Sequence, residues 1–577
     1  MRPSIDQFMW GFQPHFRSGL ERDVEEALKT INFREHVRTL LIGLAEQESA
    51  RHQVCIEPEA GPLQQATFED IDDRFDRLLP EHRDYGVFHS HPRVRDIRAR
   101  AMHDEVKGLA ITEVLDERQP YGLDRWCVGR SEAVNGYRVY PCVGVSRASL
   151  DEVPRLGERW SERFYVGVSL ADEVILEVLR QATRALRGPA PGDGLRAIDV
   201  PTWVVIRTAV SRLTGGVPVR LGNYLSGGLT DALDRLCELE YEGGSAGGTL
   251  VLTRQDNPSL TLDIKFATPI HLARTRQVRK LLELGRGRMA LVSDGHDIFG
   301  LGHTDETESH SVFVVRIRGR ARWSLEAGGT PAYNVDYGRA MLPSEPIPET
   351  RFADVLQRQL DVDAPAASHL WELVKHAATV GHGTTLVFSR GAAAEAVRLA
   401  AQSTPIEPVP LTTEALSHLS SIDGAVLLDE TGSCHAIGVI LDGEATDVGD
   451  PSRGARFNSA IRYVAKGSAP ASVVVVVSDD GMVDLVPNLR PRLPAELIEG
   501  LVEDFVGVVS REDEDGEVFA RSLHKLEEVA FYLSPEQCDR ANKAHKTEMT
   551  RRRARGEMTL VGQQFAPDPG MNDSFLL

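Results

Sequence analysis

The sequence predicts an α/β protein of several domains, and three observations support this fold class. The chain has 577 residues, several times the usual length of one domain. Segments with apolar residues at helical spacing alternate with short runs rich in valine, isoleucine and aromatic residues. One of these runs, SVVVVVS at 472–478, is almost wholly apolar, as expected for a central strand that is covered on both faces.

Changes in pattern and composition divide the chain into five parts. Residues 1–156 combine an amphipathic helix with strand-like runs such as YGVFHSH, and predict a small α/β domain. Residues 157–348 mix amphipathic helices with alternating strands, and indicate an α+β domain with a recognition or regulatory role. Residues 349–492 carry the strands and helices of a central covered sheet. Residues 493–555 are expected to be helical, and residues 556–577 to form a disordered tail.

Composition argues against several classes of function. The net charge of −20 argues against a broad nucleic-acid-binding surface, which needs clustered lysine and arginine. The six cysteines are scattered without a C-x-x-C pair, so neither a zinc knuckle nor a dithiol redox motif is expected. The N-terminus lacks a signal-peptide pattern, and no apolar run approaches the roughly 20 residues that span a bilayer. We therefore expect a soluble cytoplasmic protein without membrane or nucleic-acid partners.

The stretch GDPSRGARFNSAIRYVAKG has the composition of a loop that leads into a helix. Asn458 or Ser459 is expected to cap this helix, whose free N–H groups and positive dipole end attract anions. Gly454 and Ala455 allow a ligand to approach closely, and Arg456 adds a planar fork of donors for phosphate oxygens. On composition alone, a plain strand–helix connection whose arginine pairs with a surface carboxylate explains the stretch better.

Acidic residues accompany two strand-like runs of the same domain. Asp423 interrupts the run SSIDGAVLLD, where a carboxylate is costly to bury unless it binds a metal, a hydroxyl or a cation. Asp479 and Asp480 follow the valine-rich strand, at the kind of edge where open α/β sheets bind ligands. Carboxylates near a phosphate-binding loop are the components of metal-assisted nucleotidyl transfer. Taken alone, the Asp479–Asp480 pair is better explained as a turn before Gly481.

Together, the three stretches resemble a known family. In chain order, DGA (Asp423–Ala425), GARFNSA (Gly454–Ala460) and VSDDG (Val477–Gly481) are similar to the DGA, GTRHRAA and VSEE motifs of the diadenylate cyclase domain. This is the domain of the DNA-integrity scanning protein and its relatives, which joins two ATP molecules into cyclic di-AMP. The resemblance spans Trp371 to Pro487 and implies a central mixed sheet flanked by helices. The preceding segments resemble, in overall pattern, the probable sensor domains found before such domains.

The resemblance also implies roles for individual residues. Asp423 would hold Mg²⁺ or Mn²⁺ and help to activate a ribose 3′-hydroxyl, and Arg456 would bind phosphate. Asp479 or Asp480 would stand where the family has a metal-binding glutamate. Because each ATP must present its 3′-hydroxyl to the α-phosphate of the other, a homodimer or larger even assembly is implied. The residues implied to line the nucleotide and its phosphates are Gly424, Ala425, Gly454, Ala455, Asn458 and Ser459.

The chain departs from the family pattern in the phosphate loop. Ala455 replaces a threonine, Phe457 a histidine and Asn458 a second arginine, so one cationic group is missing. A charge-assisted phosphate contact is worth about 1.5–3 kcal/mol, and Arg453 or Arg462 could supply the missing charge. Two alternatives therefore stay open: an active, divergent cyclase, and a nucleotide-binding module that has lost catalysis.

The segment YGVFHSHPRVRDIRARAMHDE contains a second candidate site. His89 and His91 are spaced to lie on one face of a strand, and Asp104 follows on an expected helix. The pattern resembles JAMM-type zinc isopeptidases, in which two histidines and one aspartate hold the metal. The serine of that family is replaced by Ala101, and the upstream glutamate base has only candidates such as Glu57. A zinc-dependent peptidase is a further hypothesis, beside a strand-end histidine pair without metal.

Overall fold

The computed structural model divides the chain into two compact units, Arg2–Ser344 and Glu345–Leu577, which are described separately. None of the described helices has both the length and the apolar character needed to cross a membrane. The structure describes residues 6–577 apart from 60, 89, 162–163, 195, 225–226, 240–246, 286–288, 305–310, 344–346, 381–382, 444–453, 466–470, 479–481, 512–515 and 556–563.

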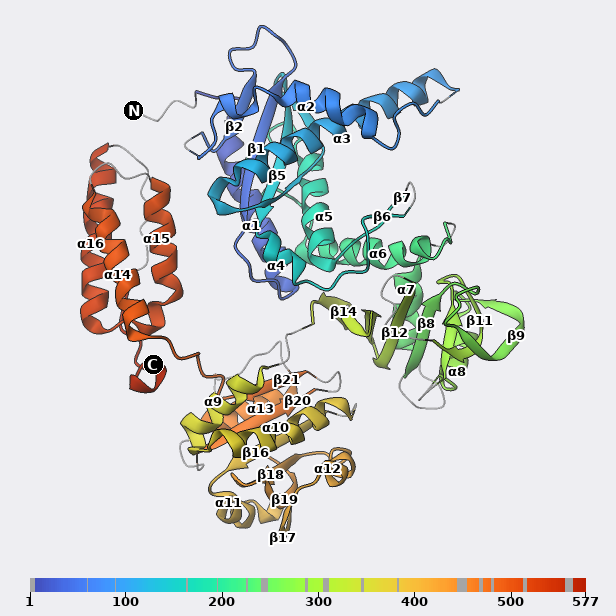
Figure 1. The fold of residues 1–577 in the computed structure, drawn as a ribbon, viewed down its shortest axis with the longest axis vertical. Helices are drawn as coiled ribbons and strands as arrows, with labels where there is room; N and C mark the ends of the chain where they lie inside the picture. The colour runs from blue at the N-terminus through green and yellow to red at the C-terminus, as the bar shows by residue number, and fades with distance from the viewer. Residues whose placement is uncertain are drawn as a thin grey trace. The chain divides into compact units, whose positions relative to one another are not determined.

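The N-terminal unit opens with a five-stranded antiparallel sheet in the order β2-β1-β5-β3, with β4 also paired to β5. One face of this sheet packs against α1 and α5, and the other against α3 (Figure 1). The strands are β1 (Arg38–Ala45), β2 (Val54–Glu57), β3 (Arg125–Val128), β4 (Glu132–Val134) and β5 (Tyr137–Val145), and a small hairpin of β6 (Trp160–Ser161) and β7 (Phe164–Tyr165) follows. The helices are α1 (Gln13–Thr30), α2 (Ile71–Leu78), α3 (Pro92–Arg118), α4 (Arg147–Asp151), α5 (Leu170–Ala185) and α6 (Thr202–Arg220).

A second sheet of eight strands completes this unit, in the order β15-β14-β13-β12-β8-β10-β11-β9. All its pairs are antiparallel except β8 with β10. The β10–β11 hairpin turns at Asp294–Gly295. The elements are α7 (Leu229–Glu238), β8 (Gly248–Thr253), β9 (Thr261–His271), α8 (Thr275–Leu282), β10 (Ala290–Ser293), β11 (Asp297–His303), β12 (Val312–Gly319), β13 (Arg322–Ala327), β14 (Thr330–Asp336) and β15 (Arg339–Met341).

The predicted boundary between residues 156 and 157 falls inside a packed body. Helix α5 follows this boundary, yet its buried residues share one core cluster with α1 and with the inner face of β5. The Thr183 hydroxyl on α5 also donates to the Arg130 carbonyl, before the boundary, at 2.7 Å. The boundary prediction rested on local changes in pattern and composition, whereas these contacts join segments that are far apart in the sequence.

The C-terminal unit contains the mixed sheet that the sequence predicted, in the order β17-β19-β18-β16-β20-β21. Helices α9, α10 and α12 cover one face, and α11 and α13 cover the other (Figure 1). The strands are β16 (Thr384–Ser389), β17 (Thr404–Pro410), β18 (Ala425–Leu428), β19 (Ser433–Val439), β20 (Ser472–Val477) and β21 (Val483–Val486). The helices are α9 (Glu349–Leu360), α10 (Ala364–Thr379), α11 (Ala392–Arg398), α12 (Thr413–Leu419) and α13 (Ala455–Ala465).

The chain ends in three helices, α14 (Ala495–Ser510), α15 (Gly516–Glu528) and α16 (Pro535–Arg555), as predicted for residues 493–555. The prediction of a disordered tail is wrong for residues 564–577, which pack onto this bundle. Phe575 is 7 % exposed, and the Arg358 guanidinium lies 4.2 Å from the centre of its ring. Leu493 N–H donates to the Phe575 carbonyl at 3.1 Å. The prediction of disorder followed from the polar composition of the tail and overlooked its apolar residues, such as Phe575.

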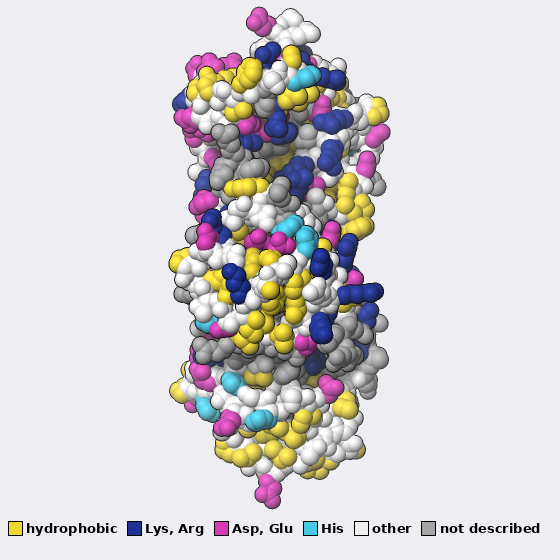
Figure 2. Space-filling view, turned by 90° about the vertical axis from the view of Figure 1, so that its right-hand side faces the viewer, with side chains coloured by type: hydrophobic (Ala, Val, Ile, Leu, Met, Phe, Trp, Pro, Cys, Tyr) yellow, Lys and Arg dark blue, Asp and Glu magenta, His cyan; other side chains and the backbone are white. Residues whose placement is uncertain are grey.

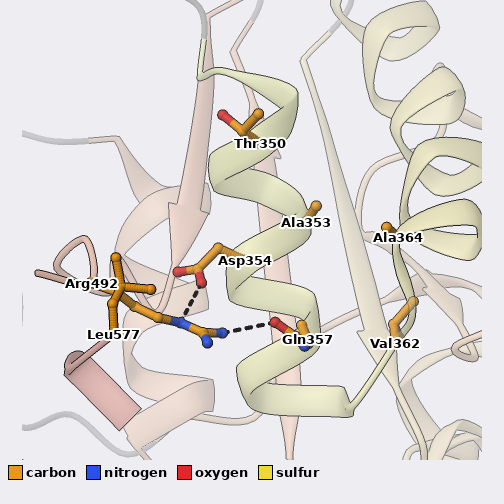
Figure 3. Close-up of a pocket in the computed structure, with 8 residues that line it drawn as sticks. All are labelled: Thr350, Ala353, Asp354, Gln357, Val362, Ala364, Arg492 and Leu577. Carbon is orange, nitrogen blue, oxygen red and sulfur yellow. Dashed lines mark hydrogen bonds and ion pairs between the residues drawn. The ribbon is translucent and has the colours of Figure 1, made fainter. Parts of the chain in front are cut away.

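A cavity of about 360 Å³ lies between α9 and the C-terminal residues (Figure 3). In it, Arg492 Nε pairs with Asp354 at 2.8 Å, and Arg492 Nη2 donates to Gln357 at 2.8 Å. Leu577 lies at the rim of the same cavity. Because the charged side chains pair with one another, this region is a packing contact between α9 and the end of the chain.

Candidate functional site

The strand register brings two of the three sequence motifs to one edge of the C-terminal sheet. Ala425, at the start of β18, lies opposite Thr385 at the start of the parallel strand β16. Val477, at the end of β20, lies opposite Thr384 because β20 runs antiparallel to β16. Val439, near the end of β19, lies opposite Ala425. The residues before β18 and after β20 therefore share one edge, called the site edge below.

Asp423 and Gly424 lead into β18 at the site edge. Asp423 is exposed, and within the described part of the chain its carboxylate forms no hydrogen bond or ion pair. Gly424 has φ +112°, and a Cβ there would lie 2.5 Å from the carbonyl carbon of Gly438. Only glycine fits this position, because an L-residue would meet both strain and a backbone clash. The DGA motif thus presents a free carboxylate on a rigid turn.

Helix α13 begins earlier than the sequence predicted. The predicted cap was Asn458 or Ser459, but the helix starts at Ala455, so both residues lie inside its first turns. The Asn458 backbone N–H and side-chain Nδ2 both donate to the Gly454 carbonyl, each at 3.2 Å. Asn458 therefore closes the first turn of the helix and does not precede it. Arg456 is exposed in this first turn.

The N-terminal end of α13 points toward the site edge. The hydroxyl of Tyr463, near the C-terminal end of this helix, interacts with Ser472. Ser472 lies opposite Ser389, at the other edge of the sheet. Because α13 packs along β20, its first turn lies toward the end of β20 that carries Val477. A helix N-terminus offers free N–H groups and a positive dipole end, which favour anions.

A buried polar network fixes α13 against α11. Tyr463 donates to the Glu395 carboxylate at 2.9 Å, and Glu395 is 3 % exposed. Burial raises the pKa of Tyr463, with a further contribution from Glu395, so the hydroxyl stays protonated as a donor. Arg398 pairs with Glu395 and also with Asp442 at 2.5 Å and 2.8 Å. No pattern in the sequence identified these residues, because they come together only across the fold.

The substituted positions of the phosphate loop are partly explained by packing. Phe457 is half-buried and packs against the core under α13, so it supplies a structural contact where the family has a histidine. Arg462 forms no hydrogen bond or ion pair with any described residue, and its Nε is buried. Arg462 is therefore an available cation on α13. Arg453 lies outside the described residues.

The acidic pair Asp479–Asp480 also lies outside the described residues. Its flanking residues are described: the N–H of Ser478, directly after β20, donates to the carbonyl of Met482, directly before β21, at 2.8 Å. Ser478 follows β20 at the site edge, since Val477 lies opposite Thr384. The sequence could not assign the end of β20 to this edge, because the antiparallel direction of β20 is set by pairing across the sheet.

Thr384 is a site-edge residue that the sequence reasoning missed. It is 2 % exposed, and its hydroxyl oxygen has no hydrogen-bond partner among the described residues. Leaving a buried hydroxyl without a partner is unfavourable. The available signal was the pair of threonines that opens the otherwise apolar strand TTLVFS.

The structure does not bring the N-terminal histidine motif together as a site. The expected strand at YGVFHSH is wrong for its described residues, which form turns and coil before α3. His91 is the N-cap of α3, whereas Asp104 lies thirteen residues further along the same helix, a rise of about 20 Å. Asp104 instead accepts hydrogen bonds from the Ser131 hydroxyl and backbone N–H. His89 lies outside the described residues.

No group of three or more histidine, cysteine, aspartate or glutamate side chains that could hold a metal occurs among the described residues. At the site edge, the only carboxylate from the sequence motifs that the structure describes is Asp423. A cation there would therefore need further oxygen ligands from a substrate, from water or from Asp479 and Asp480.

Comparison with protein families identifies three matches along the chain. Residues 372–489 match the family described as DisA bacterial checkpoint controller nucleotide-binding. Residues 9–214 and 227–329 match two families described as probable sensor domains, DACNG and DACNH. The chain therefore carries a DisA-type nucleotide-binding domain preceded by two probable sensor domains, and the resemblance drawn from the three motifs is confirmed. The match to the DACNG family, residues 9–214, extends through α5. This agrees with the core that α5 shares with α1 and β5.

Comparison with solved structures and with curated proteins adds little. A hypothetical membrane spanning protein from Bacillus cereus is 23 % identical with a TM-score of 0.18, and the match covers 22 % of this chain and 63 % of that one. A double mutant of DacA from Staphylococcus aureus is 18 % identical with a TM-score of 0.19, covering 24 % and 94 %. TM-scores this low carry no structural argument. A search of curated proteins finds no match.

Proposed function

We propose that the chain is a diadenylate cyclase-like nucleotidyltransferase, which condenses two ATP molecules into cyclic di-AMP and pyrophosphate under the control of its sensor domains. The observation that carries this proposal is the placement of Asp423 and the N-terminal end of α13 at one sheet edge. A free carboxylate beside a helix N-terminus with an exposed arginine suits a metal-bound triphosphate. The nucleotide-binding family match over residues 372–489 supports the same conclusion.

The proposed reaction is two equivalent phosphoryl transfers. The ribose 3′-oxygen of one ATP forms a bond to the α-phosphorus of the other, and the bond from that phosphorus to the bridging oxygen breaks. Pyrophosphate leaves with the bonding electron pair, and a second identical step closes the ring. Asp423 would lie beside the attacking hydroxyl and help to remove its proton. Arg456 and the first N–H groups of α13 would hold the phosphate oxygens.

Mg²⁺ or Mn²⁺ fits the donor set at the site edge. Mg²⁺ is usually held by one or two carboxylates together with substrate phosphates, and both cations take oxygen ligands. Asp423 meets this requirement because its carboxylate is exposed and engages no described residue. Asp479 and Asp480 are the further candidate ligands. When bound, the cation would neutralise charge on the phosphates.

The reaction also predicts an assembly. Each bound ATP must supply a 3′-hydroxyl to the α-phosphate of the other, which two facing copies of the site satisfy symmetrically. Asp423 and Arg456 are both exposed in a single chain, so both are accessible to a second copy. We therefore propose a homodimer or a larger even assembly as the catalytic form.

A nucleotide-binding module without catalysis is the second candidate function. Phe457 is half-buried in the core, and the Asn458 amide is already bonded to the Gly454 carbonyl. Neither side chain supplies the positive charge that the family places in this loop. Under this alternative, ATP binds at the site edge and the sensor domains respond to it without turnover.

One experiment separates the two functions. The purified full chain is incubated with ATP and Mn²⁺, and the products are resolved by chromatography. Cyclase activity predicts a cyclic dinucleotide from the wild type, and a loss of at least about 10³-fold in Asp423→Asn. The matched control is Asp361→Asn, because Asp361 is an exposed aspartate in the left-handed region that asparagine tolerates. Saturable ATP binding without product at any metal concentration would establish the binding module instead.

A further inference from the structure

The first half of α3 forms an exposed arm. Helix α3 is 27 residues long, but its buried residues begin only at Val106. The neighbouring helix α2 contacts α3 at His103, whose ring meets Phe75 edge-to-face, and at Lys107, which pairs with Asp72. Residues 92–102 therefore extend about 16 Å beyond the body of the domain (Figure 1). Residues 92–102 and the preceding residues 85–88 are called the arm below.

The arm exposes several large apolar side chains to solvent. Phe88 is 78 % exposed, Ile97 59 % and Val94 42 %. Tyr85, in the segment that precedes the helix, is 52 % exposed. Monomeric proteins seldom keep apolar side chains clustered in water, and such clusters mark interaction surfaces.

The same arm carries uncompensated positive charge. Arg93, Arg95, Arg98 and Arg100 are all exposed, and none of them forms a hydrogen bond or an ion pair within the described part of the chain. Asp96 is the only acidic residue of the helical part. Figure 2 looks onto this side of the molecule, and its upper part shows hydrophobic side chains next to Lys and Arg side chains. The arm is basic although the whole chain has a net charge of −20.

The two kinds of side chain are arranged in an orderly way around the helix. At 100° per residue, Val94, Ile97 and Ala101 fall within one narrow strip. Arg93 and Arg100 border this strip on one side, and Arg98 borders it on the other. An apolar strip between arginines is the pattern of helices that lie at a membrane surface, with the arginine stems reaching up to the headgroups.

We propose that the arm docks the N-terminal sensor domain onto an anionic phospholipid surface, with Phe88, Val94 and Ile97 entering the interface. Charge complementarity supports this partner, because four unpaired arginines face outward and anionic headgroups attract them. The exposed aliphatic side chains favour a lipid surface over nucleic acid as the partner. Binding to nucleic-acid phosphates would use the arginines but would leave Val94 and Ile97 exposed to water. An unsupported half-helix also gains stability from burying its apolar strip. The inference is independent of the proposed nucleotide chemistry.

Vesicle co-sedimentation of the full chain tests the proposal. We expect binding to phosphatidylcholine vesicles that contain phosphatidylserine, little binding to phosphatidylcholine alone, and weakening with added salt. The double variant Arg95→Gln/Arg98→Gln is expected to bind about 30-fold more weakly, at about 1 kcal/mol per arginine. Ile97→Ser is expected to bind several-fold more weakly because it removes part of the apolar strip. The matched control, Arg118→Gln/Arg155→Gln, removes two exposed arginines outside the arm and leaves binding unchanged.

Three results would overturn the proposal. The first is no binding to anionic vesicles, or equal binding by the wild type and the arm variant. The second is binding to duplex DNA that is tighter than binding to vesicles and is lost in the same variant. The third is a change of oligomeric state in the arm variants without any vesicle binding, which would make the arm a protein interface. Unchanged circular dichroism of each variant checks the fold, since every substituted arm residue is exposed.

Discussion

The site edge of the C-terminal sheet and the histidine motif before α3 behave in opposite ways. Asp423 and Gly454 are about thirty residues apart, yet the sheet and α13 bring their segments to one edge. His91 and Asp104 are much closer in sequence, yet one straight helix holds them about 20 Å apart. Spacing along the chain is therefore informative only when the intervening structure is known. A strand that returns along a sheet joins distant residues, and a helix separates near ones.

The largest expected effect concerns the rigid turn at the site edge. Gly424→Ala should destabilise the domain by at least about 3 kcal/mol, because its Cβ would lie 2.5 Å from the Gly438 carbonyl carbon and its φ is +112°. Gly454→Ala is the matched control, since a Cβ there meets nothing within 4 Å. We expect it to stay within about 0.5 kcal/mol of the wild type in urea unfolding. Equal stability of the two variants would mean that the turn is not fixed as described.

The next effect concerns the network that holds α13. Glu395→Ala leaves the Tyr463 hydroxyl and one end of Arg398 without their acceptor, and should cost about 2–3 kcal/mol. Hydrogen exchange in peptides from α11 and α13 measures this locally. Glu407→Ala, on the exposed edge strand β17, is the control with little expected change. Normal protection of α13 in Glu395→Ala would show that the network does not position this helix.

A smaller effect distinguishes structure from metal binding in the histidine motif. Asp104→Ala should cost about 1–2 kcal/mol, because the Ser131 hydroxyl and backbone N–H lose their acceptor. His91→Ala should change stability by less than about 0.5 kcal/mol, since His91 is exposed. Elemental analysis of the wild type should find no stoichiometric zinc. Zinc that disappears in both variants would revive the peptidase hypothesis.

The smallest effect depends on pH. Asp429 is partly buried, which opposes its charge, but hydrogen bonds from His435, Thr431 and two backbone N–H groups hold its pKa below the ordinary value. A lowered pKa in the folded state stabilises the protein above the unfolded pKa of about 3.9, and this stability is lost as the pH falls through the folded value. Asp429→Asn should therefore cost about 1 kcal/mol near neutral pH and progressively less below pH ~4. Hydrogen exchange of the β18–β19 hairpin against pH measures the difference.

The sequence predicted those parts of the C-terminal domain that depend on local patterns. The apolar run of β20, the glycine of the DGA motif and the helix after Gly454 all follow from residue type and spacing. Helix α13 starts before the predicted cap at Asn458 or Ser459. The Asn458 side chain bonds back to the Gly454 carbonyl from inside the first turn, which the capping propensity of asparagine does not predict. The direction of β20 and the contacts of Thr384 depend on pairing across the sheet, so no local pattern could give them.

In the rest of the chain, long-range packing decided where prediction failed. The C-terminal residues were expected to be disordered, but they are packed. The buried ring of Phe575 contacts Arg358, and the Phe575 carbonyl accepts a hydrogen bond from the Leu493 N–H. Helix α5 packs into the core of the first domain, although the predicted boundary at residues 156 and 157 lies before it. In the histidine motif, the proline after His91 began a helix where alternating residues suggested a strand, since proline suits the first helical turn.

The central claim is that Asp423 and the start of α13 act on one bound nucleotide. A double-mutant cycle measures this directly, with Mn²⁺-dependent binding of a non-reactive ATP analogue to the wild type, Asp423→Asn, Arg456→Gln and the double variant. Groups that share one ligand lose binding energy non-additively, and we predict a coupling free energy of at least about 1 kcal/mol. Effects that add within about 0.3 kcal/mol, or no analogue binding by the wild type, would contradict the claim.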